Sequence, residues 1–408
     1  MYKWAVVWLL FAAAFLNLED RTVIFSVLPL IDNDLKLTKL ESAWLMPAFL
    51  WVYAAFSPFA GWMGDRWSRR DILCWCLLGW SAVTLLCALA ANGAHLIALR
   101  AVLGVTQACY IPVAYAILAD THARETRGRA SAILHAGGAL GPIIGGTLAA
   151  WLSQTYGWRP TLAVLGAVGI VLGIACRLYI REIRVGGSEN SAAGSAGWLD
   201  TSRAVLRTPT FYCLLAASGS AAVAVWMLIT WLPVFLFDEY KMQLTKSALL
   251  GNLTISGPIL PGFVIGGLLS DAIARTDPRR RLLIVTVCFA AAAPFPLLFW
   301  FASDWPLVLA GAAAFLFFRA MGESNWHPVL YEISPPAQRS TAVGIANSFN
   351  TLMGGAGALI AGFWRDRFGL QMLFGLVSIL ILLAAGALFL GYRVYFERDR
   401  QRLRRASA

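Results

Sequence analysis

Long apolar stretches alternate with short polar ones along the whole chain. Each of twelve apolar runs is roughly 20 residues long, the length that crosses a hydrocarbon core of about 30 Å as a helix. The pattern therefore predicts an all-α integral membrane protein with twelve transmembrane helices. The runs lie at about 4–31, 41–63, 72–92, 95–119, 130–152, 160–180, 209–236, 246–270, 281–301, 304–330, 340–363 and 371–392.

The composition also places most of the chain in lipid. Of the 408 residues, 59% are hydrophobic and 13% are charged, whereas an ordinary soluble domain carries about 25% charged residues. The seven cysteines are odd in number and all fall within the apolar runs, so we interpret them as small core residues and expect no metal site or disulfide.

The placement of the basic residues explains the net charge of +11, which in a soluble protein would suggest a nucleic-acid partner. With a cytoplasmic N-terminus, 23 of the 33 Lys and Arg residues fall in cytoplasmic loops and tails, and 7 fall on the opposite side. This asymmetry is the positive-inside signature. It predicts a multi-pass protein of the bacterial inner membrane with both termini in the cytoplasm, and it requires no nucleic acid.

The chain divides into two halves of six helices each. The longest polar stretch, at 181–208, is rich in Gly, Ser and Ala and is predicted to be a flexible cytoplasmic linker. It separates a half at 1–180 from a half at 209–392, and a basic tail follows at 393–408.

The two halves carry similar motifs. "GWMGDRWSRR" (61–70) and "GLLSDAIARTDPRRR" (267–281) each contain Gly-x-x-x-Asp followed by arginines, and the fourth and tenth helices each open on Arg-Ala and close on Pro-Val-x-Tyr. Two pseudo-symmetric six-helix bundles are typical of secondary transporters, whose substrate site lies near the midplane.

Two of these motifs resemble those of the major facilitator superfamily. "GWMGDRWSRR" resembles its Gly-x-x-x-Asp-Arg-x-Gly-Arg-Arg/Lys signature, with Ser68 at the second Gly position. "GGALGPIIGG" (137–146) resembles its Gly-Pro-x-x-Gly-Gly motif. The resemblance implies the major facilitator fold and transport by alternating access.

Within this superfamily the chain resembles Spinster-like transporters. "NLEDRTVIFSVLPLI", beginning at Asn17, is similar to their Asn-x-x-Asp-Arg…Val-Leu-Pro-x-Ile run. The anion:cation symporter group, which carries sugar acids and organic anions, shares the Asp-Arg pair and the arginine of the fourth helix. Both groups usually carry Glu where this chain has Gln107. Because Gln107 is neutral, we expect the proton-titrating carboxyl group of this half in the first helix and not in the fourth.

The first helix holds three adjacent charged residues, Glu19, Asp20 and Arg21. A charge at the bilayer centre costs about 2.5–3.5 kcal/mol, so it usually faces a cavity or a partner. Asp20 and Arg21 are about 100° apart around a helix, so they face different surroundings. We predict that Asp20 and Glu19 take part in proton coupling and that Arg21 binds substrate. The alternative is a structural ion pair that fastens the first helix to the fourth.

The fourth helix places Arg100, Gln107 and Tyr110 near one stripe, and all three are candidates for substrate binding. The planar guanidinium of Arg100 suits a carboxylate or phosphate bidentately. Two interpretations stay open for Arg100, namely substrate binding and a structural salt bridge to Glu19 or Asp20.

The tenth helix carries Arg319 and Glu323 at a spacing that allows an ion pair on one face. Either the pair only lowers its own burial cost, or Glu323 is released and protonated when substrate takes Arg319. Further candidates for substrate binding are polar residues that also have structural interpretations as packing or hydrogen-bonded side chains. They are His135, Asn325, His327 and Asn347.

A cytoplasmic gate is predicted from the repeated loop motif. Its carboxylates and guanidinium groups would pair with helix ends in one conformation only, which would bias the equilibrium between outward-open and inward-open forms. The residues are Gly61, Asp65, Arg66, Arg69, Arg70 and Asp271.

These observations predict a secondary active transporter that couples protons to an organic anion bearing a carboxylate or phosphate. The alternative is a Spinster-like transporter of an amphipathic lipid such as a lysophospholipid or a sphingoid-type molecule. We expect a monomer among membrane lipids, with no cofactor and no enzymatic activity. The chain has no Gly-x-x-x-x-Gly-Lys phosphate loop that would support ATP-driven pumping.

Overall fold

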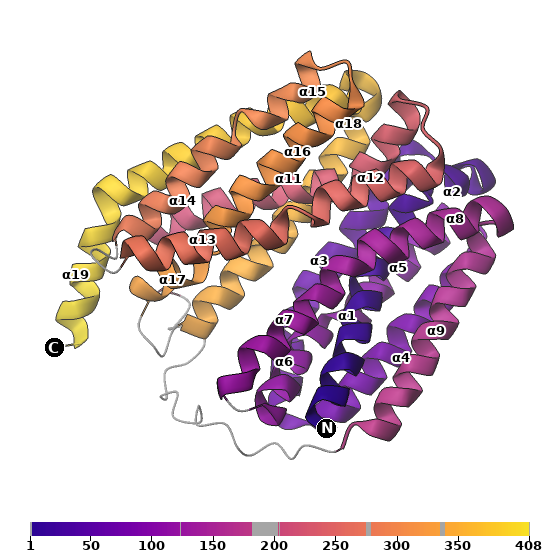
Figure 1. Ribbon diagram of the computed structural model, residues 1–408, viewed down its shortest axis with the longest axis horizontal. Coiled ribbons are helices and arrows are strands. Elements are labelled where there is room, and N and C mark those ends of the chain that lie inside the picture. The colour runs from indigo at the N-terminus through magenta and orange to yellow at the C-terminus, as the bar shows by residue number, and fades with distance from the viewer. Residues whose placement is uncertain are drawn as a thin grey trace. The chain divides into compact units, whose positions relative to one another are not determined.

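The structure is a computed structural model, and it describes residues 2–122, 124–181, 203, 205–274, 279–334 and 339–407. Helices make up the regular structure throughout this described part, with no strand in it (Figure 1). The chain forms two compact units. The first contains the described residues of Met1–Glu189, Ile229–Ser256 and Ala358–Phe363, and the second those of Asn190–Leu228, Gly257–Gly357 and Trp364–Ala408.

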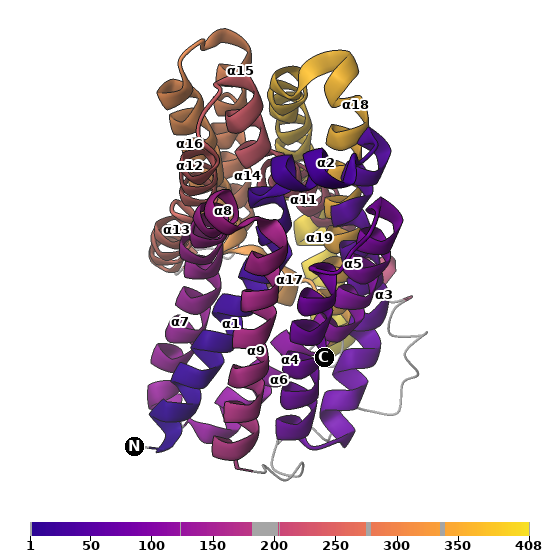
Figure 2. The ribbon, with the colours of Figure 1, turned by 90° about the vertical axis from the view of Figure 1, so that its right-hand side faces the viewer.

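The helices of the first unit come mainly from the first half of the chain (Figure 2). Within it α4 packs along α9, α3 along α5, and α1 along α7. Its helices are α1 (Tyr2–Ser26), α2 (Leu28–Leu35), α3 (Lys39–Arg66), α4 (Arg69–Cys87), α5 (Gly93–Ala108), α6 (Tyr110–Thr121), α7 (Arg124–Leu140), the π-helix η1 (Gly141–Gly145), α8 (Gly146–Tyr156), α9 (Trp158–Tyr179), the end of α11 (Pro209–Glu239) and α12 (Leu244–Ser256).

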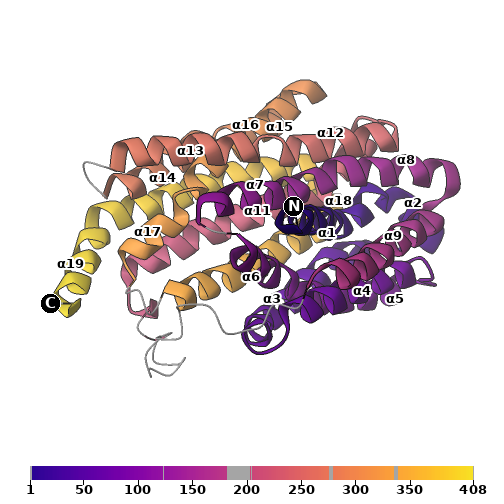
Figure 3. The ribbon, with the colours of Figure 1, turned by 60° about the horizontal axis from the view of Figure 1, so that its bottom comes forward.

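The second unit contains the remaining helices (Figure 3). Within it α13 and α14 both pack on α16. Its helices are the first part of α11, α13 (Ile259–Ala274), α14 (Arg279–Ala292), the 3₁₀ turn η2 (Phe295–Leu297), α15 (Leu298–Phe301), α16 (Trp305–Glu323), α17 (Trp326–Glu332), most of α18 (Arg339–Leu390), the π-helix η4 (Gly391–Tyr395) and α19 (Phe396–Ser407).

The described helices follow the predicted apolar runs. Nine helical segments of the described residues are long and apolar enough to cross a membrane, and one of them, Ala342–Arg402, covers the last two predicted runs. Gly369 separates these two runs, because its φ of 76° lies in the left-handed region that interrupts a helix. The charged helix α1 and helix α3 occupy the first two runs.

Short polar motifs begin several helices. Thr38 and Glu41 form a capping box at the start of α3, in which each side chain accepts from the other residue's backbone N–H. The hydroxyl of Ser68 accepts from the backbone N–H of Asp71 at 3.4 Å and caps α4. The departure from Gly at this motif position therefore has a structural use.

The fifth predicted run packs against α1 and contains a break in its α-helix. Its helix changes to the π-helix η1 between α7 and α8, and Pro142 lies in this turn. A Cβ added at Gly137 would lie 2.4 Å from the carbonyl oxygen of Phe11, and one added at Gly141 would lie 2.2 Å from that of Phe15. These glycines let the backbones of the two helices touch, as small residues do in membrane proteins.

Residues from the second half of the sequence also belong to the first unit and pack on its helices. Ala150, Leu244 and Ala248 form a buried apolar cluster with Leu30 and Phe237 packed on it. On α12, the side-chain amide Nδ2 of Asn252 donates to Oγ of Ser26 at the end of α1, at 3.3 Å. The predicted division of the chain at 181–208 stays a prediction, since most of that linker lies outside the described residues.

Candidate functional site

The three charged residues of α1 are all buried, and each has different surroundings. Glu19 is 0% exposed, Asp20 5% and Arg21 8%. Successive residues of a helix point about 100° apart, so the three side chains reach different neighbouring helices. Each is therefore described by its own contacts.

The Arg21 guanidinium lies between an amide and two aromatic rings. Its Nε donates to Oε1 of Gln107 at 3.0 Å. Its Cζ lies 4.6 Å from the ring centroid of Tyr53 and 5.3 Å from that of Phe49, which is cation–π geometry. Its Nη2 is buried and has no hydrogen-bond partner among the described residues. The group is thus held in place while one donor nitrogen remains available.

Arg100 is fully buried and contacts the backbone of two other helices. Its Nη1 donates to the carbonyl of Asp20 at 2.9 Å and its Nη2 to that of Arg21 at 3.0 Å, both on α1. Its Nε donates to the carbonyl of Leu45 on α3 at 3.2 Å. Neither open interpretation of Arg100 anticipated these contacts, in which its guanidinium ties α5 to α1 and α3 through carbonyl groups.

The Asp20 carboxylate contacts α4. Its Oδ1 accepts from the hydroxyl of Thr84 at 3.1 Å, and the same hydroxyl lies 3.1 Å from the carbonyl of Trp80. Asp20 and Arg21 therefore meet different helices, as their 100° separation predicts.

The side chain of Glu19 packs against Gly145 in the π-helix η1. A Cβ added at Gly145 would lie 2.3 Å from Cγ of Glu19, so only glycine leaves room for this side chain. Both carboxyl oxygens are buried without a hydrogen-bond partner in the described part of the chain. Such a group is expensive as an anion, because nothing replaces the water it has lost.

Two further polar side chains of the first unit, those of Asn17 and Tyr110, are fully buried. Asn17 precedes Arg21 by one helical turn, and both of its side-chain amide atoms lack a partner among the described residues. The hydroxyl of Tyr110 donates to the carbonyl of Leu10 at 2.9 Å, and its ring meets that of Trp80 edge-on. Tyr110 is thus engaged with backbone in this conformation.

The second unit contains the predicted pair of α16. Nη1 of Arg319 lies 2.6 Å from Oε2 of Glu323, and the carboxylate is the more exposed partner. Asn325 is buried, and its Nδ2 lies within hydrogen-bond distance of the carbonyls of Gly266 and Met321, which indicates helix packing. The side chain of His327 lies outside the described residues.

The remaining candidates are exposed. His135 on α7 lies beside Tyr115, whose hydroxyl is 2.8 Å from Nε2, while Nδ1 lies 3.0 Å from the carbonyl of Ser131. The same hydroxyl lies 3.0 Å from Nδ1, so both ring nitrogens lie within hydrogen-bond distance of groups on α6 and α7. Asn347 on α18 is exposed, and within the described part of the chain its backbone carbonyl accepts from the hydroxyl of Thr351.

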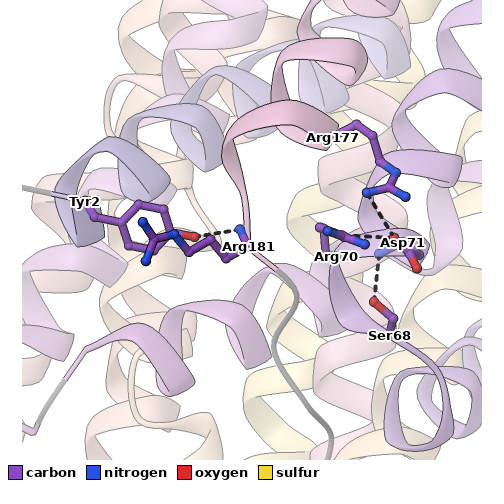
Figure 4. A network of polar contacts seen from close by, with 6 residues as sticks. All are labelled: Tyr2, Ser68, Arg70, Asp71, Arg177 and Arg181. Atoms are coloured by element: carbon purple, nitrogen blue, oxygen red, sulfur yellow. Dashed lines mark hydrogen bonds and ion pairs between the residues drawn. The ribbon is translucent and has the colours of Figure 1, made fainter.

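The described part of the predicted gate consists of ion pairs inside the first unit. Arg69 pairs with Asp120 at the end of α6. Asp71 lies 3.0 Å from Nε of Arg70 and 3.8 Å from Nη1 of Arg177 on α9 (Figure 4). The side chains of Asp65, Arg66 and Asp271 and the surroundings of Gly61 lie outside the described residues, so the role of these four residues as a gate stays a prediction.

Three contributors to the site were not among the predicted residues. They are Phe49 and Tyr53 on α3, which stack on Arg21, and Thr84 on α4, which binds Asp20. Nothing in their local sequence distinguishes them from packing residues. Asn17 did carry a signal, because it lies four residues before Arg21 and so shares its helix face.

Buried charges among membrane-spanning helices are characteristic of transport proteins, and the relatives of the chain belong to that class. The family profile of the Major Facilitator Superfamily matches residues 10–278 and 252–407. The chain therefore belongs to the major facilitator superfamily. It is a multi-pass membrane transporter and not an enzyme.

Individual relatives agree with this assignment. Protein spinster homolog 1 of Xenopus tropicalis is 26% identical, over 97% of this chain and 82% of that protein. A protein of Bacillus subtilis named "Probable galactarate/D-glucarate transporter" is 24% identical, over 90% of this chain and 86% of that one.

Solved structures confirm the fold. A bacterial homologue of the human lysosomal transporter Spinster, crystallised in an inward-facing and unoccupied conformation, gives a TM-score of 0.81 at 22% identity and covers 98% of each chain. The predicted all-α, twelve-helix major facilitator architecture and the resemblance to Spinster-like proteins are therefore confirmed.

Proposed function

We propose that this transporter moves an organic anion bearing a carboxylate or phosphate group, and that it couples this movement to protons. One observation carries the proposal. The Arg21 guanidinium is buried and held by Gln107 and two rings, yet its Nη2 has no partner among the described residues. A fixed cation with a free donor is suited to bind an anionic oxygen.

The neutral partner of Arg21 supports this role. An amide such as Gln107 orients the guanidinium without cancelling its charge. A carboxylate at the same place would compete with an incoming anion for the same nitrogen atoms. Arg100 is a weaker candidate, because its guanidinium already donates to three backbone carbonyls.

We assign proton binding to the two carboxyl groups of α1. Asp20 accepts a single hydrogen bond from a hydroxyl, and Glu19 has no donor in the described part of the chain. Burial of an unpaired carboxylate in a membrane protein is costly, so both groups gain from carrying a proton while they are shielded from water. A conformational change that wets them would release it, which ties protonation to the transport cycle.

The Arg319–Glu323 pair of the second unit would serve as a switchable contact in this scheme. The two side chains are 2.6 Å apart, and Glu323 is partly exposed. A substrate anion that engages Arg319 would free Glu323 to be protonated. The orientation with both termini in the cytoplasm and the location in a bacterial inner membrane belong to the same proposal, and the 23-to-7 distribution of basic residues supports them.

Proteoliposomes with an imposed pH gradient test the proposal. Galactarate and D-glucarate are suitable first probes, because a 24% identical relative bears them in its name. We expect Asp20→Asn to abolish accumulation against a gradient while exchange of substrate across the membrane continues. Accumulation by the Asp20→Asn protein at the wild-type level would rule out Asp20 as the coupling group.

Binding of a lipid is the second candidate, and the similarity to Spinster homologues supports it. A thermal-shift screen of sugar diacids, sugar phosphates and lysophospholipids separates the two. Stabilisation by a diacid that Arg21→Gln removes favours the organic anion. Stabilisation by lysophospholipids alone favours the lipid.

A further inference from the structure

The last membrane-spanning helix continues into α19 and carries a ridge that changes from apolar to basic. Leu390, Val394, Arg398 and Arg402 follow one another at intervals of four residues, so each lies one turn from the next on neighbouring positions of the helix surface. Leu390 is 48% exposed and Val394 51% exposed, and both arginines are exposed as well. The helix end lies at one extremity of the second unit (Figure 1).

The acidic residues of α19 are turned away from this ridge and are occupied within the second unit. Glu397 lies 2.6 Å from Nε of Arg279 at the start of α14. Asp399 is buried, and its Oδ2 accepts from the backbone N–H of Thr210 at 3.0 Å and from its hydroxyl at 2.7 Å. Asp399 thereby caps the N-terminus of α11.

One arginine of α19 also faces inward. Nε of Arg400 lies 3.5 Å from Oε2 of Glu332 at the end of α17. Arg398 and Arg402, by contrast, take part in none of the ion pairs found among the described residues. In α19 the carboxylates of Glu397 and Asp399 therefore face the protein, whereas Arg398 and Arg402 lie on the exposed side.

The order along the ridge matches a phospholipid. Leu390 and Val394 are the outward side chains at the end of an apolar span, where they meet acyl chains. Arg398 and Arg402 follow at about 1.5 Å per residue, so they reach the depth of the headgroups and beyond. Basic residues next to a membrane span attract anionic headgroups.

We propose that this ridge, defined as Leu390, Val394, Arg398 and Arg402, is a binding site for an anionic phospholipid. The headgroup phosphate lies on the two arginines and an acyl chain lies along Leu390 and Val394. Because Asp399 and Glu397 anchor α19 to α11 and α14, an occupied site stabilises the end of the bundle where three helices meet.

Titration of the purified full-length protein with defined lipids tests the site in the absence of any transport substrate. The protein in neutral detergent is mixed with phosphatidylglycerol or with phosphatidylcholine of the same acyl chains, and lipid binding is measured by native mass spectrometry and by the shift in Tm. We expect phosphatidylglycerol to bind more tightly than phosphatidylcholine. Arg398→Gln and Arg402→Gln should each weaken phosphatidylglycerol binding by about fivefold.

Matched variants separate this site from a general effect of charge. Arg367→Gln removes another exposed arginine of the second unit and should leave phosphatidylglycerol binding unchanged. The Arg398→Lys/Arg402→Lys protein keeps both charges and should retain most of the affinity. Both ridge arginines are exposed, so the glutamine variants are expected to fold normally, which gel filtration checks.

Two results would overturn the proposal. One is equal phosphatidylglycerol affinity in the wild type and in the Arg398→Gln/Arg402→Gln protein. The other is stabilisation of the same size by inorganic phosphate or by glycerophosphate, which would identify a soluble anion and not a lipid as the ligand.

Discussion

Arg21 on α1 bonds to an amide on α5, because its Nε donates to Oε1 of Gln107 at 3.0 Å. The side chain that orients the buried cation therefore leaves its charge uncompensated. The nearest carboxylate in sequence, Asp20, contacts the hydroxyl of Thr84 on α4. The Arg21 guanidinium and the Asp20 carboxylate thus contact different helices. The first prediction follows from the absence of a carboxylate at position 107.

Gln107→Glu should weaken the binding of an organic anion. A carboxylate at this position would form a charge-assisted hydrogen bond with Arg21 worth about 1.5–3 kcal/mol, which the anion would have to break. We expect roughly a tenfold or greater loss of affinity at pH 7.5. Binding of D-glucarate to the wild type and to the Gln107→Glu protein at pH 7.5, measured by thermal shift or calorimetry, checks this.

Gln107→Met is the matched control, because it removes the hydrogen bond and adds no charge. Its affinity should stay closer to the wild type than that of the acidic variant. Equal losses in the two variants would mean that the orientation of Arg21, and not its free charge, determines binding.

Arg100→Lys should destabilise the protein more than it weakens ligand binding. The fork of Arg100 reaches the carbonyls of Asp20, Arg21 and Leu45, and a lysine ammonium is a point charge that does not span them. Each hydrogen bond from the charged guanidinium that lysine does not replace is worth about 1.5–3 kcal/mol. We expect a clear fall in Tm in detergent for the Arg100→Lys protein.

Arg21→Lys provides the opposite pattern and serves as the comparison. It should lower affinity for an anion and change Tm little, because Arg21 makes one hydrogen bond to the described part of the protein. If Arg100→Lys left Tm unchanged and reduced affinity instead, the result would favour Arg100 as a direct ligand of the substrate.

The apolar pattern predicted the spans well because the requirement is one-dimensional, since about 20 apolar residues in a row are enough to cross the bilayer. Helix geometry alone also predicted that the side chains of Asp20 and Arg21 point in different directions. Neither argument predicted which residues of other helices these side chains contact. Tyr53 meets Arg21 and Thr84 meets Asp20 through the packing of α3 and α4 on α1, and the sequence of one helix does not specify its register against another.

The contribution of the Asp34–Arg159 pair to stability should depend on pH. Asp34 lies at the end of α2, pairs with Arg159 at the start of α9, and accepts from Nε1 of Trp158 at 3.1 Å. The hydrogen bond from Arg159 is the main reason that the pKa of Asp34 lies below its usual value. A lowered pKa in the folded state means that the stabilisation is present above about pH 4, where unfolded Asp ionises, and is lost as the pH falls further.

Asp34→Asn should therefore lower Tm at pH 6, and the difference from the wild type should shrink as the pH falls below about 4. In an Arg159→Gln background the same substitution should have a smaller effect at pH 6. A constant difference in Tm over the whole pH range would contradict the assignment.

Gly145→Ala should be costly, and the cost should depend on Glu19. A Cβ at Gly145 would lie 2.3 Å from Cγ of Glu19, well inside contact distance. Overpacking of this kind costs about 1–3 kcal/mol. Glu19→Ala removes Cγ and should restore room, so the cost of Gly145→Ala should fall in that background. Chemical unfolding of the four proteins of the cycle in detergent measures this coupling.

Gly267→Ala is the control for this cycle, because nothing lies within 4 Å of a Cβ added there. It should be neutral or slightly stabilising, since alanine favours a helix by about 1 kcal/mol over glycine. Additive effects of Gly145→Ala and Glu19→Ala would show that the two residues are not in contact. Strong coupling would show that the Glu19 side chain and Gly145 are in contact, so that the close packing of α1 on η1 depends on glycine at this position.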